Sequence, residues 1–187
     1  AMGLSLAECA RGITGGGSYL GRLDARTLPD GVTFLCDYWK ASIGSLAPAF
    51  DALAQARAQR RIAVVGTLSD YPGAAGDRYR KVARSLLAIA DVVIFVGPQA
   101  ALVNKLQPEA GGRTLRSFAE VSEVQDFLQG IVRKGDLVLL KGSGKVDHLE
   151  RLVLAHERPV ACWRSRCGRK INCHECPLLM RPERPAA

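Results

Sequence analysis

The chain has 187 residues, of which 48% are hydrophobic and 24% are charged, and its formal net charge is +8. These values are ordinary for a soluble globular protein, and no apolar run approaches the length of a bilayer span, which excludes an integral membrane protein. The first residues lack the basic start and apolar core of a secretory signal, so we expect a cytoplasmic protein without a membrane partner.

Short apolar runs alternate with amphipathic stretches along the chain. Runs rich in Val, Ile, Leu or Phe predict strands over 32–36, 61–66, 92–97 and 137–141. Amphipathic stretches predict helices over 45–59, 76–90, 121–133 and 146–156. Continuous apolar strands suit a sheet that is covered on both faces. The alternation therefore predicts an α/β fold, a three-layer Rossmann-like open sheet that is mostly parallel.

Composition divides the chain into three parts. Residues 1–30 form a linker and leading segment, and residues 31–158 form the Rossmann-like domain. Residues 159–187 form a small cysteine-rich appendage.

The loop after the fourth predicted strand, GSGK at 142–145, precedes a predicted helix. A phosphate-binding loop of the GxxxxGK[ST] type requires a glycine five positions before Gly144 and a Ser or Thr after Lys145, but Leu139 and Val146 stand there. The chain therefore lacks such a loop. Backbone amides at the start of the following helix could still attract an anion, and a tight strand–helix turn that needs glycines is the alternative.

A series of motifs runs through the chain in one order: Gly21-Arg22, Gly31-Val32-Thr33, Asp37-Tyr38-Trp39-Lys40-Ala41-Ser42, 61–66, 79–97, 135–143 and Leu149-Glu150-Arg151. Their order and spacing between residues 3 and 155 resemble the C-terminal domain of the Mur ligase family of ATP-dependent amide (peptide) ligases. The resemblance is strongest to the type that adds D-alanyl-D-alanine to the muramoyl tripeptide.

The resemblance implies a division of labour between the domains of one chain. In such ligases the central domain holds ATP and Mg²⁺ and activates a carboxylate as an acyl phosphate, with release of ADP. The C-terminal domain closes over the site, contacts the nucleotide and brings an amino acid or small peptide as the acceptor; closure also excludes water. Because this chain lacks the phosphate loop, we expect it to be inactive without the remaining ligase domains.

The same resemblance implies roles for individual residues, none of them catalytic. Arg22 would reach the terminal phosphate with its forked guanidinium, Asp37 the ribose, and Lys40 the acyl phosphate. Solvated surface charge is the alternative for Arg22 and Lys40, and a helix N-cap is the alternative for Asp37. Residues that would bind the acceptor lie in loops after the predicted strands: Ser42, Thr67, Ser69, Asp70, Lys141, Ser143 and His148.

Three positions on the acceptor side depart from the family pattern. Ile43 replaces a usual proline, Thr67 a common acidic residue, and Gly144 a common arginine. These changes argue against an ordinary cell-wall substrate. Because Lys141 and Lys145 place two positive charges in one loop, we hypothesise an acidic acceptor such as glutamate, as in polyglutamate-type products.

Four of the six cysteines crowd into the appendage: Cys162, Cys167, Cys173 and Cys176. In a reducing compartment such crowding favours a metal over disulfides, and Cys173 and Cys176 have the spacing of a zinc knuckle. We predict a structural zinc ion held by the four thiolates. An iron–sulfur cluster and free or partly oxidised thiols are the alternatives.

Two other function classes stay open. Seven Arg or Lys and three Glu in residues 157–187 would suit a nucleic-acid-binding zinc knuckle, but one Trp gives no aromatic series for base stacking. The other class is a nucleotide-sensing α/β module, and no GxGxxG follows a predicted strand. Nucleic acid is therefore not an expected partner.

Overall fold

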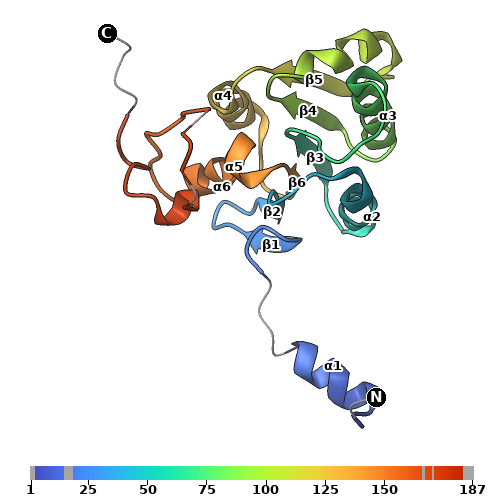
Figure 1. Ribbon diagram of the computed structural model, residues 1–187, viewed down its shortest axis with the longest axis vertical. Coiled ribbons are helices and arrows are strands. Elements are labelled where there is room, and N and C mark those ends of the chain that lie inside the picture. The colour runs from blue at the N-terminus through green and yellow to red at the C-terminus, as the bar shows by residue number, and fades with distance from the viewer. Residues whose placement is uncertain (1–2, 15–18, 166, 170, 183–187) are drawn as a thin grey trace.

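The computed structural model describes residues 3–14, 19–165, 167–169 and 171–182. Within these ranges six strands form one sheet in the order β1-β2-β6-β3-β4-β5. The strands are β1 (Asp24–Thr27), β2 (Thr33–Asp37), β3 (Arg60–Val65), β4 (Val92–Val96), β5 (Thr114–Phe118) and β6 (Asp136–Lys141). β1 pairs antiparallel with β2, and the other neighbouring strands are parallel. The predicted mostly parallel sheet is confirmed (Figure 1).

Helices cover both faces of the sheet and make it the middle of three layers (Figure 1). One face carries α2 (Leu46–Gln55), α3 (Ala75–Leu87) and the 3-10 segment η2 (Ala100–Glu109), and the other carries α4 (Val121–Ile131) and α6 (Glu150–Glu157). Successive residues of β3 alternate between the layers. Ala63 faces the first core, whereas Ile62 and Val64 face the second. Burial on both sides explains why the central strands are continuously apolar.

The predicted strands correspond to β2, β3, β4 and β6, whereas the outer strands β1 and β5 are absent from the sequence prediction. An edge strand is covered incompletely, so its sequence lacks a continuous apolar run. β1 alternates between half-buried and exposed residues, and β5 fully buries only Leu115. β1 also shows that the leading segment contributes a strand to the sheet.

The helix predicted over 146–156 is in fact two helices, α5 (Gly144–Asp147) and α6. The helix is interrupted at His148, whose left-handed φ of +53° ends α5. The break lets α5 stay beside the strand ends while α6 packs on the sheet.

The connections after β3 and β6 diverge, and this divergence positions the site. β3 continues into α3 on one face, and β6 continues toward α6 on the opposite face. Adjacent parallel strands whose connections leave to opposite faces open a crevice beyond their carboxyl ends, where ligands of such sheets bind. The loops after β3 and β6 are therefore the first place to look for a site.

After α6, the described residues of the segment 160–182, called here the cysteine-rich tail, pack beside that helix (Figure 1). Their small core joins Leu154 of α6 to Cys173, Leu179 and the flanking Val160. Cys173 lies in the 3-10 turn η3 (Cys173–Glu175). The tail is thus fixed to the domain through one helix.

Two short elements complete the description. The 3-10 turn η1 (Ile43–Ser45) leads into α2 and packs Ile43 against the first core, whereas α1 (Leu6–Thr14) stands clear of the sheet in Figure 1. In the part of the chain that the structure describes, no helix combines the length and apolarity needed to cross a membrane.

Candidate functional site

The loops after β3 and β6 are joined by the carboxylate of Asp147 in α5. Its Oδ2 atom accepts hydrogen bonds from the backbone N–H groups of Thr67 at 2.8 Å and Ser143 at 2.6 Å, and Oδ1 accepts one from Thr67 Oγ1 at 2.6 Å. The Ser143 hydroxyl donates to the Thr67 carbonyl at 3.0 Å. Burial raises the pKa of Asp147, and the three donors oppose that rise. This network fixes the crevice between the two strands.

Glycine is required where the backbone passes this carboxylate. A Cβ on Gly66 would lie 2.1 Å from Asp147 Oδ2, and a Cβ on Gly142 would lie 2.7 Å from Leu149 Cδ1. Neither space admits a side chain without movement of the neighbour. Gly142 of the GSGK loop therefore serves close packing in the turn between β6 and α5, which agrees with the alternative of a tight strand–helix turn.

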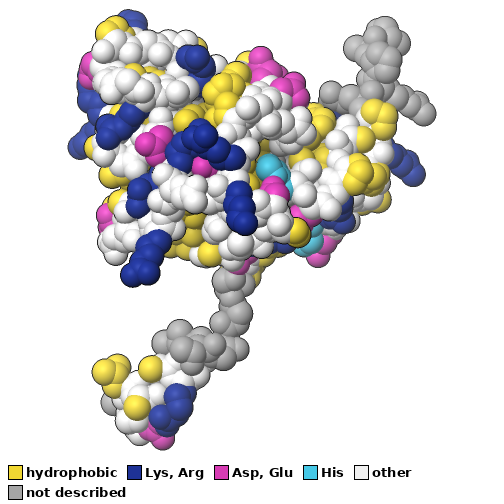
Figure 2. Space-filling model, turned by 180° about the vertical axis from the view of Figure 1, so that it is seen from behind, with side chains coloured by type: hydrophobic (Ala, Val, Ile, Leu, Met, Phe, Trp, Pro, Cys, Tyr) yellow, Lys and Arg dark blue, Asp and Glu magenta, His cyan; other side chains and the backbone are white. Residues whose placement is uncertain are grey.

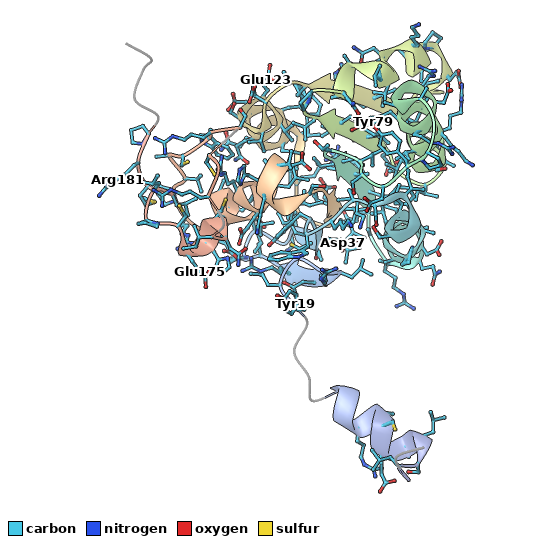
Figure 3. The ribbon with its side chains drawn as sticks, viewed as in Figure 1. Tyr19, Asp37, Tyr79, Glu123, Glu175 and Arg181 are labelled. Atoms are coloured by element: carbon cyan, nitrogen blue, oxygen red, sulfur yellow. The ribbon has the colours of Figure 1, made fainter. Side chains whose placement is uncertain are left out.

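The loop after β2 is held by an internal ion pair. Lys141, with a relative exposure of 1%, places its Nζ 2.6 Å from Asp37 Oδ2 and 2.8 Å from the carbonyl oxygen of Lys40. Its ammonium therefore holds the Asp37 loop to the end of β6. Figure 3 shows Asp37 near the middle of the domain, between the tail with Arg181 and the side with Tyr79. Lys141 is thus a positioning residue for the loop.

A cavity of about 380 Å³ opens beside these loops. Such a volume fits an amino acid or a short peptide. Its walls come from the loops after β2, β3 and β6, from the start of α6 and from the cysteine-rich tail: residues 38–40, 69–70, 143–146, 148, 150 and 171–173. This cavity is called the strand-end pocket below.

The charges of the strand-end pocket largely cancel. Lys40 Nζ lies 2.7 Å from Asp70 Oδ2, and this ammonium lowers the pKa of Asp70. Among the described residues, no ion pair involves Lys145. Burial, followed by the nearby Arg151, lowers the pKa of His148 to about 4, so its ring is neutral at neutral pH. Lys145 is therefore the cation that the pocket offers to a ligand.

Six of the predicted site residues line the strand-end pocket: Lys40, Ser69, Asp70, Ser143, His148 and, from the predicted zinc ligands, Cys173. The others lie outside its lining: Arg22, Asp37, Ser42, Thr67, Lys141, Cys162, Cys167 and Cys176. Sequence reasoning assigned no site role to Tyr38, Trp39, Val146, Glu150, Ile171 and Asn172, which also line it. The aromatic pair after β2 is the one signal that could have pointed to these residues, because it follows a buried strand directly.

The four predicted zinc ligands are not arranged as a metal site. Among the residues that the structure describes, no group of three or more His, Cys, Asp or Glu side chains is placed to hold a metal ion. Cys167 and Cys173 instead flank His148, with Sγ–N distances of 3.4 Å to Nε2 and 3.6 Å to Nδ1. Burial raises the pKa of Cys173 to about 11, which favours its neutral thiol. The structure therefore gives the zinc prediction no support, and it stays a prediction.

The nucleic-acid alternative also gains no support from the face of the molecule shown in Figure 2. Lys and Arg side chains are scattered over the face shown in Figure 2, and acidic and hydrophobic side chains lie among them. A nucleic-acid site would gather basic side chains on one face.

Comparison with known proteins identifies the family. A family model described as Mur ligase, glutamate ligase domain, matches residues 21–144. The chain belongs to the Mur ligase family. The match confirms the resemblance inferred from the strand-end motifs, and because it ends at Gly144, the cysteine-rich tail lies beyond it.

Individual relatives agree with this assignment. The UDP-N-acetylmuramoyl-tripeptide--D-alanyl-D-alanine ligase of Treponema pallidum is 33% identical over 125 residues, which are 65% of this chain and 27% of the relative. MurF from Acinetobacter baumannii has a TM-score of 0.68 at 22% identity, over 84% of this chain and 34% of that one. MurF ligase from Thermotoga maritima in complex with ADP has a TM-score of 0.58 at 21% identity, over 80% and 35%. The chain thus spans about a quarter to a third of the length of these relatives.

Proposed function

We propose that this chain is the acceptor-binding domain of an ATP-dependent amide ligase, and that it closes over a nucleotide held mainly by the other domains. The observation that carries the proposal is the strand-end pocket, which lies at the divergence of β3 and β6 in a Mur ligase fold. The Treponema pallidum relative is named as a D-alanyl-D-alanine ligase, and one MurF structure holds ADP. These names support an amino acid or short peptide as the acceptor and ATP as the energy source.

The described residues suit contact with a nucleotide from one side rather than enclosure of its triphosphate. Leu139 is buried inside β6 at the place where a phosphate loop requires its first glycine. The segment with Arg22 lies against the loop after β2, because Trp39 N donates to the Gly21 carbonyl at 3.2 Å. The rings of Tyr19 and Trp39 also meet edge to face at 6.1 Å.

We assign nucleotide contacts to the three residues that the family resemblance named. Arg22 and Lys40 are exposed and would donate to phosphate oxygens, while Asp37 would face the ribose. Bound ATP and Mg²⁺ supply the activation of a donor carboxylate as an acyl phosphate. This domain binds the acceptor, orients its amine toward that carboxylate and excludes water as it closes.

The strand-end pocket favours an acceptor with one carboxylate over an acidic one. The glutamate hypothesis relied on Lys141 and Lys145, but Lys141 is buried and paired with Asp37. Lys145 alone is left to bind a carboxylate, and the hydroxyls of Ser69 and Ser143 are placed in the same lining to hydrogen-bond polar groups. A second carboxylate would lie near Asp70 and Glu150 without a cation of its own.

Phosphate release is the measurement that tests the proposed function. We expect no release by the 187-residue chain with ATP and Mg²⁺ alone. A polypeptide that joins this domain to its remaining ligase domains should release phosphate in the presence of a donor carboxylate and an acceptor. Turnover by the isolated chain, or turnover by the longer polypeptide that no amino acid or peptide stimulates, would contradict the proposal.

A further inference from the structure

The cysteine-rich tail is anchored to the domain by two oppositely charged residues at the start of α6. Glu150 accepts a hydrogen bond at 2.8 Å from the backbone N–H of Cys173 and is also bonded to the His174 ring. Arg151, with a relative exposure of 2%, donates to the Arg164 carbonyl at 2.7 Å and to Cys173 Sγ at 3.4 Å. Because both charged groups are buried, loss of one of these hydrogen-bond partners would be costly, so the contacts hold the tail in one arrangement.

The tail is also closed on itself. The backbone N–H groups of Ala161 and Cys162 both donate to the Leu179 carbonyl at 2.9 Å, and Leu179 is buried against Leu154 of α6. Figure 3 shows Glu175 of η3 beside the lower end of the domain, on the side away from Tyr79. Anchors on both sides of the 171–173 segment make this segment a fixed part of the structure.

That segment forms one wall of the strand-end pocket. Ile171, Asn172 and Cys173 line the cavity together with Val146 of α5. Ile171 and Val146 are 41% and 51% exposed, which is high for large aliphatic side chains and leaves surface for a ligand to cover. The segment adds an aliphatic side chain, a carboxamide and a thiol to the lining. An apolar side chain of the ligand would meet this wall while its carboxylate meets Lys145.

We propose that the tail is a specificity element, in which Ile171 selects an acceptor amino acid or peptide with an aliphatic or aromatic side chain and Asn172 adds binding that does not depend on that side chain. Ile171 packs with Val146 on that side chain, and Asn172 hydrogen-bonds the polar backbone of the acceptor. The inference rests on the proposed function, because it specifies the occupant of the same pocket. The wall residues 171–173 lie beyond residues 21–144, the region that the family model matches.

The test is a binding series by NMR titration of the 187-residue chain with glycine, alanine, leucine, phenylalanine, glutamate and the dipeptides alanyl-alanine and alanyl-leucine. We expect the leucine and phenylalanine ligands to bind most tightly. Ile171→Ala should weaken their binding about 5- to 10-fold, because it removes three carbons from a partly covered contact, while glycine binding changes less than about 2-fold. The Ile171→Phe variant should still bind glycine and alanine, but its larger side chain should prevent binding of the larger ligands. Asn172→Ala should weaken all ligands by a similar factor.

Met180→Ala is the matched control, since Met180 is an exposed tail residue outside the pocket lining. It should change no affinity, and unchanged amide spectra of each free variant show that the tail has kept its fold. Suppose that the unsubstituted chain binds leucine, but that Ile171→Ala weakens the binding of leucine and glycine equally or leaves both unchanged. The proposed selectivity of the tail would then be wrong, while the assignment of the pocket to the acceptor would still hold. If the unsubstituted chain binds none of the ligands, both the proposed acceptor-binding function and the proposed selectivity of the tail are refuted.

Discussion

Replacement of Asp147 by alanine tests whether one buried carboxylate holds the two strand-end loops together. The substitution removes the acceptor of both backbone N–H groups, those of Thr67 and Ser143, and of the Thr67 hydroxyl. Asn at position 147 is the matched control. Its carboxamide oxygen can occupy the Oδ2 position and accept both N–H groups, while its NH₂ group donates to the Thr67 hydroxyl.

The structure sets the size of the expected effect. A buried N–H group left without a partner costs about 1–3 kcal/mol, so the two groups set an upper limit of about 6 kcal/mol. Asp147 also lines a second cavity of about 250 Å³ at the ends of β4 and β5, from which water can reach the exposed donors. We therefore expect Asp147→Ala to lower the free energy of unfolding by about 2–4 kcal/mol. Asp147→Asn keeps the hydrogen bonds and removes a buried charge, and should cost about 1 kcal/mol or less.

Urea unfolding of the chain and both variants, followed by circular dichroism, measures the difference. With a slope of about 2 kcal/mol per molar urea, the midpoint should fall by about 1–2 M for Asp147→Ala and by less than about 0.5 M for Asp147→Asn. Equal losses in the two variants, or a loss below about 1 kcal/mol for alanine, would show that the hydrogen bonds of this carboxylate do not hold the loops.

Three further predictions concern packing, charge and metal. Gly66→Ala should lower the free energy of unfolding by about 1–3 kcal/mol in the same urea assay, because its Cβ would lie 2.1 Å from Asp147 Oδ2. Gly130→Ala is the control, and open space at that helical position predicts a gain of about 0.5–1 kcal/mol. Lys145→Gln should weaken acceptor binding about 10-fold in NMR titrations, whereas Lys105→Gln, an exposed change outside the pocket, should not; equal effects would remove Lys145 from the site. The zinc prediction requires about one equivalent of metal in protein purified without added zinc, and less than about half an equivalent would refute it.

The sequence predicted the part of the fold that local composition controls. Continuous apolar runs identify β2, β3, β4 and β6, because a strand covered on both faces needs apolar side chains at every position. The edge strands β1 and β5 and the segment η2 with Pro108 lack such a run or a regular helical stripe. Their positions depend on the elements that they pack against, and these tertiary contacts cannot be deduced from a single sequence.

The candidate site was predictable as a set of loops but not as a set of contacts. Once the strands are known, the divergence rule for parallel sheets points to the loops after β3 and β6, and Ser69, Ser143 and His148 do line the pocket. Lys141 shows the limit. A lysine after a buried strand suggests a ligand, but its partner Asp37 lies 104 residues away, and only the pairing of β2 with β6 brings the two together.

The motif Leu149-Glu150-Arg151 gains a role that its resemblance to the family did not suggest. Two adjacent residues of opposite charge at the start of a helix suggest a solvent-exposed surface. In this chain, however, Glu150 and Arg151 are both buried under the tail. Their described partners are the N–H group and Sγ of Cys173, the Arg164 carbonyl and the His174 ring, and none of these is a side chain of Ile171 or Asn172. The wall residues Ile171 and Asn172 can therefore be exchanged while the anchor and the Asp147 network stay intact. This separation of anchor from wall is the physical reason why acceptor preference and stability should respond to different substitutions in this chain.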